Sequence, residues 1–138
     1  MPDVQAYGVC GGAELSEDPL HFAFENISFD RVIAHEGKGC ILTRRVLDAS
    51  GGCAANFIDL TVIPPGCDIG LHKHTNDNEE IYVIVCGSGE MSVDGRQIEV
   101  GPGHVIVNRP GGTHGLRNNG VSDLRLVVME VPTDRKPA

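Results

Sequence analysis

The chain has 138 residues, of which 41% are hydrophobic and 22% are charged, and its formal net charge at pH 7 is −8. This length suits one domain with a core of ordinary size, and no apolar run reaches the ~20 residues that a membrane-spanning helix needs. The acidic balance argues against nucleic acid as a partner, and the lack of a basic start and an apolar block at the N-terminus predicts a cytoplasmic protein.

The predicted elements are short strands separated by turn signals. Residues 1–26 have no sustained periodicity, and we expect them to form an arm or an extra strand that covers the domain made by residues 27–138. Strand-like runs of that domain occur at 28–35, 40–47, 55–63, 81–86, 89–93, 97–100, 105–108 and 124–131. The pair Asp94-Gly95 lies between two alternating runs and predicts a hairpin. Since no window has a convincing helical period, the sequence predicts an all-β sandwich or barrel.

A histidine-rich stretch between the third and fourth of these runs holds the clearest chemistry. His72 and His74 stand two residues apart, and the acidic pair Glu79 and Glu80 follows them. In an extended strand, residues two apart point to the same side, so both imidazoles can face one point. A carboxylate at the head of the next strand can reach the same point. Two neutral imidazoles and a carboxylate suit a divalent transition metal, and two surface histidines at a strand edge are the alternative.

A second cluster follows, in which His114 stands after the turn Pro110-Gly111-Gly112. With it, the sequence resembles the cupin superfamily over roughly residues 55–131. The first cupin motif is a glycine, five residues, HxH, three or four residues, a glutamate, six residues and a glycine. It is matched by Gly66, His72, His74 and Gly87. The second motif, a glycine, five residues, PxG, two residues, a histidine, three residues and an asparagine, is matched by Gly103, Gly111, His114 and Asn118.

The motif glutamate is open between two neighbours. Counting six residues back from Gly87 selects Glu80, whereas counting forward from His74 selects Glu79. The run up to Gly87 reads as a regular strand, while the loop after His74 can absorb an extra residue. We therefore predict Glu80, with Glu79 as the alternative.

The resemblance implies a single-domain cupin jelly roll, a double-stranded β-helix barrel. It also implies one divalent transition metal, which can be Fe, Zn, Mn, Ni or Co. The implied ligands, inside one end of the barrel, are His72, His74, Glu80 and His114. A homodimer is expected as well, because cupin barrels often pair through strands of their sheets, and residues 1–26 are a candidate exchanging element. The expected partner is a small-molecule substrate, with neither nucleic acid nor a membrane involved.

Strand alternation extends the predicted site to its walls. Tyr82 shares the face of Glu80, as a core aromatic or as a phenol that hydrogen-bonds or transfers a proton beside the metal. Apolar walls are expected from Ile84 and Leu116. Asp59 and Thr61 would contact substrate if the polar side of their strand points inward, which the sequence leaves open.

Cations and the remaining histidines complete the candidate residues. One of the neighbours Arg44 and Arg45 should point inward, which makes Arg44 a candidate contact for an anionic substrate. Arg109 replaces the usual first proline of the second motif and places a second cation near the barrel mouth. His21, His35 and His104 have no partners in the pattern, and we expect them to be exposed or structural.

Three histidines and one carboxylate leave two open positions on a six-coordinate ion. Such positions let the ion polarise a substrate oxygen, hold dioxygen or lower the pKa of a bound water. The resemblance therefore implies a metal-dependent enzyme of dioxygenase, lyase or isomerase type acting on a small polar oxygen-bearing substrate. The alternative is a non-enzymatic, metal-dependent sensor or binding protein for a sugar or another metabolite, since fold alone does not decide the reaction.

Overall fold

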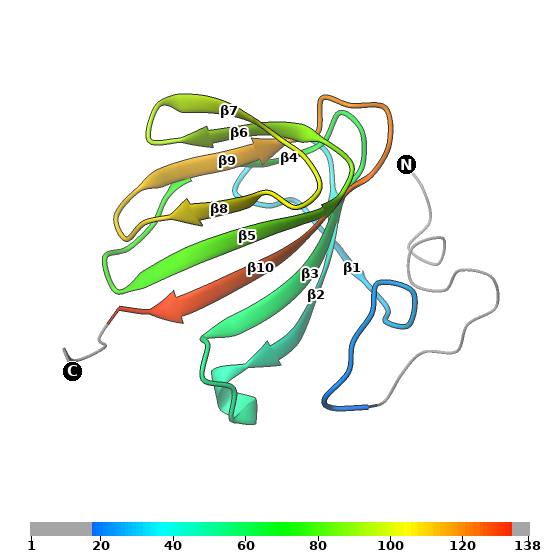
Figure 1. The fold of residues 1–138 in the computed structure, drawn as a ribbon, viewed down its shortest axis with the longest axis vertical. Helices are drawn as coiled ribbons and strands as arrows, with labels where there is room; N and C mark the ends of the chain where they lie inside the picture. The colour runs from blue at the N-terminus through cyan, green and yellow to red at the C-terminus, as the bar shows by residue number, and fades with distance from the viewer. Residues whose placement is uncertain (1–17, 134–138) are drawn as a thin grey trace.

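The computed structural model describes residues 18–133, which form two antiparallel sheets facing each other (Figure 1). The six strands of the larger sheet, in spatial order, are β1 (Asp30–Val32), β2 (Ile41–Asp48), β3 (Phe57–Ile63), β10 (Leu124–Pro132), β5 (Asn78–Cys86) and β8 (Val105–Asn108). The four strands of the smaller sheet are β4 (Asp68–Lys73), β9 (Thr113–Arg117), β6 (Gly89–Val93) and β7 (Arg96–Val100). The predicted all-β architecture is confirmed.

A single short helix accompanies the strands in this part of the chain, the 3-10 turn η1 (Ala49–Gly51). Within residues 18–133, no helix has the length and apolar character needed to span a membrane. The predicted hairpin is present between β6 and β7, where Asp94 and Gly95 both have positive φ, at 47° and 81°. Those angles suit the twist of an antiparallel pair joined by two residues.

The main core fills the space between the two sheets. It is made by the inward residues of both sheets, because burying alternate apolar side chains on facing strands removes their surface from water. Its fully buried members include Tyr82 and Ile84 on β5, Met91 on β6, and Leu116 on β9. On β5, Glu80 continues the same inward face beyond Tyr82 and is itself buried.

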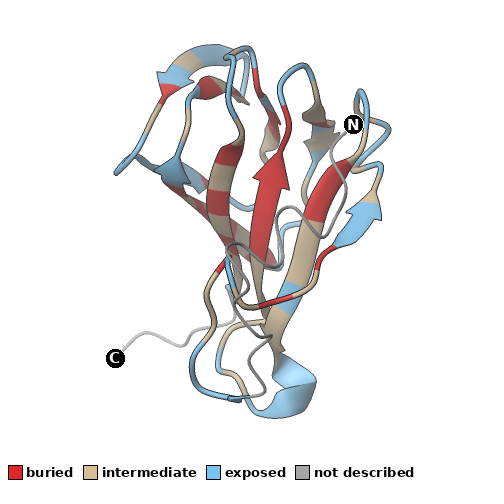
Figure 2. Cartoon of the chain, turned by 90° about the vertical axis from the view of Figure 1, so that its right-hand side faces the viewer, coloured by how far each residue is buried: buried red, intermediate tan, exposed pale blue. Residues whose placement is uncertain are grey.

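A second core lies on the outer face of the larger sheet. Phe24, Ile27 and Phe29, which precede β1, pack there against the outward residues of β2 and β3. Residues 18–26 of the predicted arm therefore cover a sheet face, and residues 1–17 lie outside the described residues. Figure 2 shows the buried residues concentrated on the central strands, with η1 and the connecting loops exposed.

The two largest differences from the predicted strand boundaries, three residues each, are at the start of β5 and at the end of β1. β5 begins at Asn78 rather than at residue 81, because β10 extends far enough to pair Pro132 with Asn78. β1 ends at Val32 rather than at residue 35, because the backbone then turns through His35 and Glu36 at φ values of 52° and 58°. This turn carries the chain across to β4, where Gly70 N donates to Ala34 O at 3.0 Å.

Candidate metal centre

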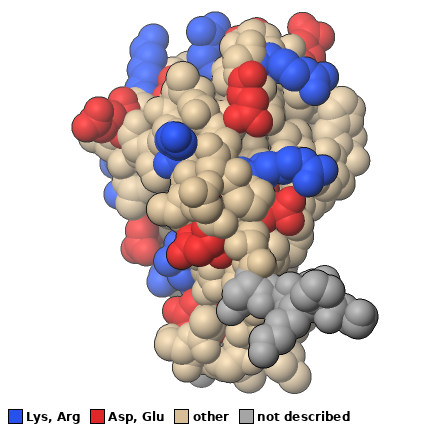
Figure 3. Space-filling model, turned by 90° about the vertical axis from the view of Figure 1, so that its left-hand side faces the viewer, with Lys and Arg blue, Asp and Glu red and all other residues tan. Residues whose placement is uncertain are grey.

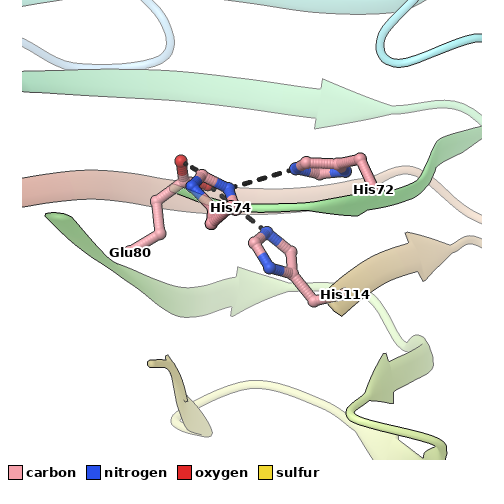
Figure 4. Close-up of side chains that lie close together, drawn as sticks. All are labelled: His72, His74, Glu80 and His114. Carbon is pink, nitrogen blue, oxygen red and sulfur yellow. Dashed lines mark hydrogen bonds and ion pairs between the residues drawn. The ribbon is translucent and has the colours of Figure 1, made fainter. Parts of the chain in front are cut away.

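Two parts of the sequence, residues 72–80 and His114, bring four polar side chains together between the sheets (Figure 4). His72 lies in β4 and His74 follows its last residue, His114 lies in β9, and Glu80 comes from β5 of the opposite sheet. β4 and β9 are neighbours, and their register places His72 beside His114. The backbone of His74 is held by a hydrogen bond from its N–H to Gly112 O at 2.9 Å.

The four side chains converge closely. One ligand atom from each of His72, His74, Glu80 and His114 lies within 4.8 Å of the others. The Nε2 atoms of His72 and His74 are 3.1 Å apart, and His74 Nε2 is 3.2 Å from Glu80 Oε2. His114 Nε2 is 3.5 Å from Glu80 Oε1. Glu80 is the acidic residue that joins the histidines, whereas the neighbouring Glu79 projects to the other face of β5.

Hydrogen bonds on the far side of two imidazoles set their orientation. His72 Nδ1 donates to Gly70 O at 2.7 Å, and His74 Nδ1 donates to Asn78 Oδ1 at 3.1 Å. An imidazole that donates through Nδ1 keeps a lone pair on Nε2, so two lone pairs face each other in the cluster. A cation between them removes this repulsion, and such outer hydrogen bonds are typical of histidines that bind metal ions.

His114 provides a second sign that the cluster suits a cation. Its side chain is 1% exposed, and neither ring nitrogen has a hydrogen-bond partner among the described residues. Buried polar atoms are normally paired, because leaving them unpaired destabilises the fold. Three imidazole nitrogens and a carboxylate form a donor set that binds divalent transition metals. The residues present therefore fit such an ion.

The protonation states also suit a cation. Burial lowers the pKa of His72 to about 4, so this imidazole is neutral at pH 7. Burial by itself would raise the pKa of Glu80, but the neighbouring His114, His74 and His72 outweigh it, and the pKa lies below its usual value. Neutral histidines and an ionised carboxylate are the forms in which these side chains coordinate metals.

His35 belongs to this site, contrary to the expectation that it has no partner. Its ring is stacked on that of His72, with centroids 3.4 Å apart and an interplanar angle of 6°. Burial is the main reason why the pKa of His35 is lowered, and Glu80, His74 and His114 also act on it. The motif pattern holds no signal for this residue, because it reaches the site through a turn that docks on β4.

Glycines allow that turn to approach β4 so closely. A Cβ on Gly70 would lie 2.2 Å from His35 O, and a Cβ on Gly37 would lie 2.6 Å from Asp68 O. Two further bonds fasten the turn, from Asp68 N to Lys38 O at 3.0 Å and from Lys38 N to Asp68 Oδ1 at 2.7 Å. The position of His35 is therefore built into the backbone.

The predicted walls of the site are buried inside the barrel. Tyr82, Ile84 and Leu116 are each 1% exposed and belong to the main core. The ring of Tyr82 lies edge-on to that of His114, with centroids 5.4 Å apart. Burial, with the Glu80 carboxylate nearby, raises the pKa of Tyr82 well above its usual value, so its hydroxyl keeps its proton. Tyr82 can thus act as a hydrogen-bond donor beside the cluster.

The polar side of β3 points into the barrel, which the sequence left open. Thr61 is buried and its hydroxyl lies 3.1 Å from that of Thr43 on β2. Asp59 accepts from Arg45 through both carboxylate oxygens, at 3.0 and 3.3 Å, and the Arg45 guanidinium lies 3.8 Å from the centroid of the Phe57 ring. Direct contact of Asp59 or Thr61 with a substrate stays a prediction.

Arg44 does not point inward, and it is Arg45 that lies on the barrel-facing side of β2, beside Asp59 and with its side chain 52% exposed. Arg44 Nε donates to Ser28 O at 2.7 Å, and its guanidinium also bonds the Ser28 hydroxyl. It shares its face of β2 with Leu42, which the N-terminal segment covers, so it points away from the cluster. Arg109 is exposed in the loop after β8, where its carbonyl accepts from Gly112 N at 3.0 Å. A substrate contact by Arg109 stays a prediction.

Comparisons with known proteins identify the family of this chain. A family model described as "Cupin domain" matches residues 59–130. An oxalate-binding protein of Thermotoga maritima is 34% identical over 67 residues, which are 49% of this chain and 54% of that protein. An uncharacterised protein of Methanocaldococcus jannaschii is 35% identical over 71 residues, 51% of this chain and 56% of the other. The matched part thus spans little more than half the length of these curated relatives.

Solved structures show the same fold. A predicted oxalate decarboxylase from Thermotoga maritima superposes with a TM-score of 0.71 at 27% identity, over 75% of this chain and 91% of that one. A Cupin 2 conserved barrel domain protein from Salinispora arenicola gives a TM-score of 0.58 at 19% identity, over 67% of this chain and 76% of the other. At this level of identity, the similarity to the Salinispora arenicola protein supports only the barrel architecture.

Proposed function

We propose that this chain, which belongs to the cupin family, holds one divalent transition metal ion and uses it to bind and activate a small oxygen-bearing acid. The proposed ligands are His72, His74, Glu80 and His114, and the ion is one of Fe, Zn, Mn, Ni and Co. The observation that carries the proposal is the convergence of four ligand atoms within 4.8 Å from segments of both sheets. The proposed reaction is of dioxygenase, lyase or isomerase type.

The charge of the site favours an anionic ligand. A divalent ion held by three neutral imidazoles and one carboxylate keeps one positive charge in excess, which attracts carboxylate oxygens and polarises them. The chain's own residues would orient such a ligand: Tyr82 keeps a hydroxyl proton beside Glu80, and Ile84 and Leu116 supply apolar walls. Apolar walls limit the access of water and strengthen electrostatic interactions inside the barrel.

A short dicarboxylate such as oxalate is the first ligand class that we propose. Two similar proteins carry oxalate in their names, one as a binding protein and one as a predicted decarboxylase. The word "binding" in the first name favours a second candidate function, a metal-dependent acid-binding protein without turnover. Both candidates require the same four ligands and differ only in whether the bound acid is converted.

The test begins with protein purified without chelator, in which metal content is measured. Oxalate is then titrated calorimetrically into the metal-loaded and the metal-free protein, with acetate as the control acid. We expect saturable oxalate binding that needs the metal and is lost in His74→Ala. Formation of formate or carbon dioxide from oxalate, or uptake of oxygen, would support the enzyme. Saturable binding without conversion of any acid would support the binding protein, and full metal content in His74→Ala would contradict the site.

A small-molecule partner agrees with the charge distribution. On the face drawn in Figure 3, Lys and Arg side chains are interspersed with Asp and Glu, which is unlike the basic surface that nucleic acids need.

We also propose a homodimer through the outer face of β5 and β8. Val85, Val105 and Val107 are 47%, 60% and 41% exposed there, and adjacent exposed valines favour contact with a second copy. A cytoplasmic location stays a prediction from the sequence.

A further inference from the structure

A buried polar side chain that has no role in either cupin motif lies beside the four-residue cluster. Asn108, the last residue of β8, is 2% exposed and shares the inward face of Ile106. In the register of β5 and β8 it lies directly opposite Glu80. Cβ atoms of such cross-strand pairs are about 4.5–5.5 Å apart, so the carboxamide borders the proposed metal ligand.

The amide of Asn108 has no partner for either of its polar atoms. Within residues 18–133, the buried side-chain atoms without a hydrogen-bond partner are Nδ2 and Oδ1 of Asn108 and the two ring nitrogens of His114. Both residues flank Glu80, one through the β5–β8 register and the other at 3.5 Å from the carboxylate. The unpaired polar groups therefore gather at one place, which is the proposed site.

Another buried asparagine of this fold shows what a structural amide looks like. Asn118 is completely buried, and its Nδ2 donates to Ile63 O and to Ser122 O, both at 2.8 Å. Its Oδ1 accepts from Gly120 N at 2.9 Å. Asn118 thus ties β9 to two other segments, whereas Asn108 ties nothing. An unpaired buried amide costs stability, and such costs gather at sites where a ligand later supplies the missing partner.

We propose that Asn108 is a specificity-determining residue that recognises the acid bound at the metal centre, with Nδ2 donating to a carboxylate oxygen. This assignment rests on the proposed function, since it needs an acid beside Glu80. It adds a residue that the predicted site lacks, and it assigns the carboxylate recognition to the barrel interior rather than to Arg44 or Arg109. The amide discriminates against an apolar analogue of the acid, because such an analogue would leave the buried amide without a hydrogen-bond partner.

The test uses Asn108→Leu, which keeps a similar shape without polar atoms, and Asn118→Leu as the matched control. In metal-free protein, Asn108→Leu should leave the melting temperature unchanged or raise it, because it removes an unpaired amide. Asn118→Leu should lower it, because it removes three hydrogen bonds. Metal-loaded Asn108→Leu should keep the metal content of the parent and bind oxalate about tenfold or more weakly by calorimetry. If Asn108→Leu fails to fold, Asn108→Ala serves for the same oxalate comparison.

Two results would overturn the assignment. A melting temperature that falls as far in Asn108→Leu as in Asn118→Leu would make Asn108 a structural residue. Parent-like oxalate affinity in both Asn108 variants would show that the amide does not touch the acid. Failure of the proposed function looks different: the parent itself would then bind metal but no oxalate, or no metal at all, and the assignment of Asn108 would fall with it.

Discussion

The imidazole of His35 lies parallel to that of His72, with ring centroids 3.4 Å apart and planes inclined by 6°. His72 is thereby held on two sides, by this stack and by the bond from its Nδ1 to Gly70 O at 2.7 Å. A ring held in this way keeps Nε2 aimed at the cluster. Groups that orient a metal ligand commonly change metal affinity although they do not touch the ion.

We therefore expect His35→Asn to release metal faster than the parent. Asparagine tolerates the positive φ of 52° at this position, so the turn can persist while the stacked ring is lost. We expect metal affinity to fall about 10-fold to 100-fold. The faster dissociation of the metal is measured as the rate of its transfer to a chelator. His35→Phe should restore slow release, because it keeps a flat ring. His104→Asn, at an exposed position in the turn before β8, is the control, and equal rates in all four proteins would refute the role of the stack.

A second prediction concerns Gly70→Ala, which adds a methyl group where two backbone segments touch. The new Cβ would lie 2.2 Å from His35 O and 2.9 Å from Gly37 N, so the turn over β4 must shift. We expect the free energy of unfolding in urea to fall by about 1–3 kcal/mol, as for other overpacked positions. Gly101→Ala is the matched control, since its Cβ would meet nothing within 4 Å, and it should stay within about 0.5 kcal/mol of the parent. Equal stability of the two variants would contradict the close approach.

A third prediction separates the two neighbouring glutamates. Glu80→Gln removes the carboxylate that lies 3.2 Å from His74 and 3.5 Å from His114, while Glu79→Gln changes a side chain on the other face of β5. We expect Glu80→Gln to lose about tenfold or more in metal affinity and Glu79→Gln to match the parent. Metal content after dialysis measures both. The assignment fails if Glu79→Gln is the variant that loses metal.

A fourth prediction is a pH dependence of the metal-free protein. His72 has a folded pKa of about 4 against a reference value of 6.5, so between these values the unfolded chain binds a proton that the folded chain does not. Protonation then favours unfolding, and the contribution of His72 to stability is complete above about pH 6.5 and is lost as the pH falls toward 4. Melting temperatures at several pH values should fall on acidification, less steeply in His72→Gln. Parallel curves for the two proteins would show that His72 is not the group responsible.

A fifth prediction addresses the proposed homodimer. Val107 projects from the outer face of β5 and β8, where Val105 of β8 and Val85 of β5 are also exposed. Val107→Lys would place a charge in a contact between two copies and should convert the dimer to monomers in light scattering after gel filtration. Val121→Lys, at a position that is 99% exposed in the loop before β10, should leave the dimer intact. A monomeric parent would contradict the dimer, and a dimeric Val107→Lys would place its interface on another face.

The sequence by itself determined the all-β class, which depends on local regularities, and its resemblance to the cupins implied the barrel and the four members of the cluster. Period-2 alternation places His72 and His74 on one side of a strand, and turn residues separate the strands. The same regularity led from Gly87 back to Glu80, the glutamate that the structure brings to the histidines. Fixed spacing within one strand is enough to decide such relations.

Only the tertiary structure decided the inward face of β3 and the place of Arg45. Both faces of β3 are buried, one in the barrel and the other under Phe24, Ile27 and Phe29, so alternation carries no sign of which side is inside. His35 and Asn108 were likewise beyond the sequence pattern. One reaches the cluster through a turn that docks on β4, and the other through the pairing of β8 with β5. Contacts between distant segments depend on how strands pair and sheets pack, and the spacing of residues along the sequence does not determine either.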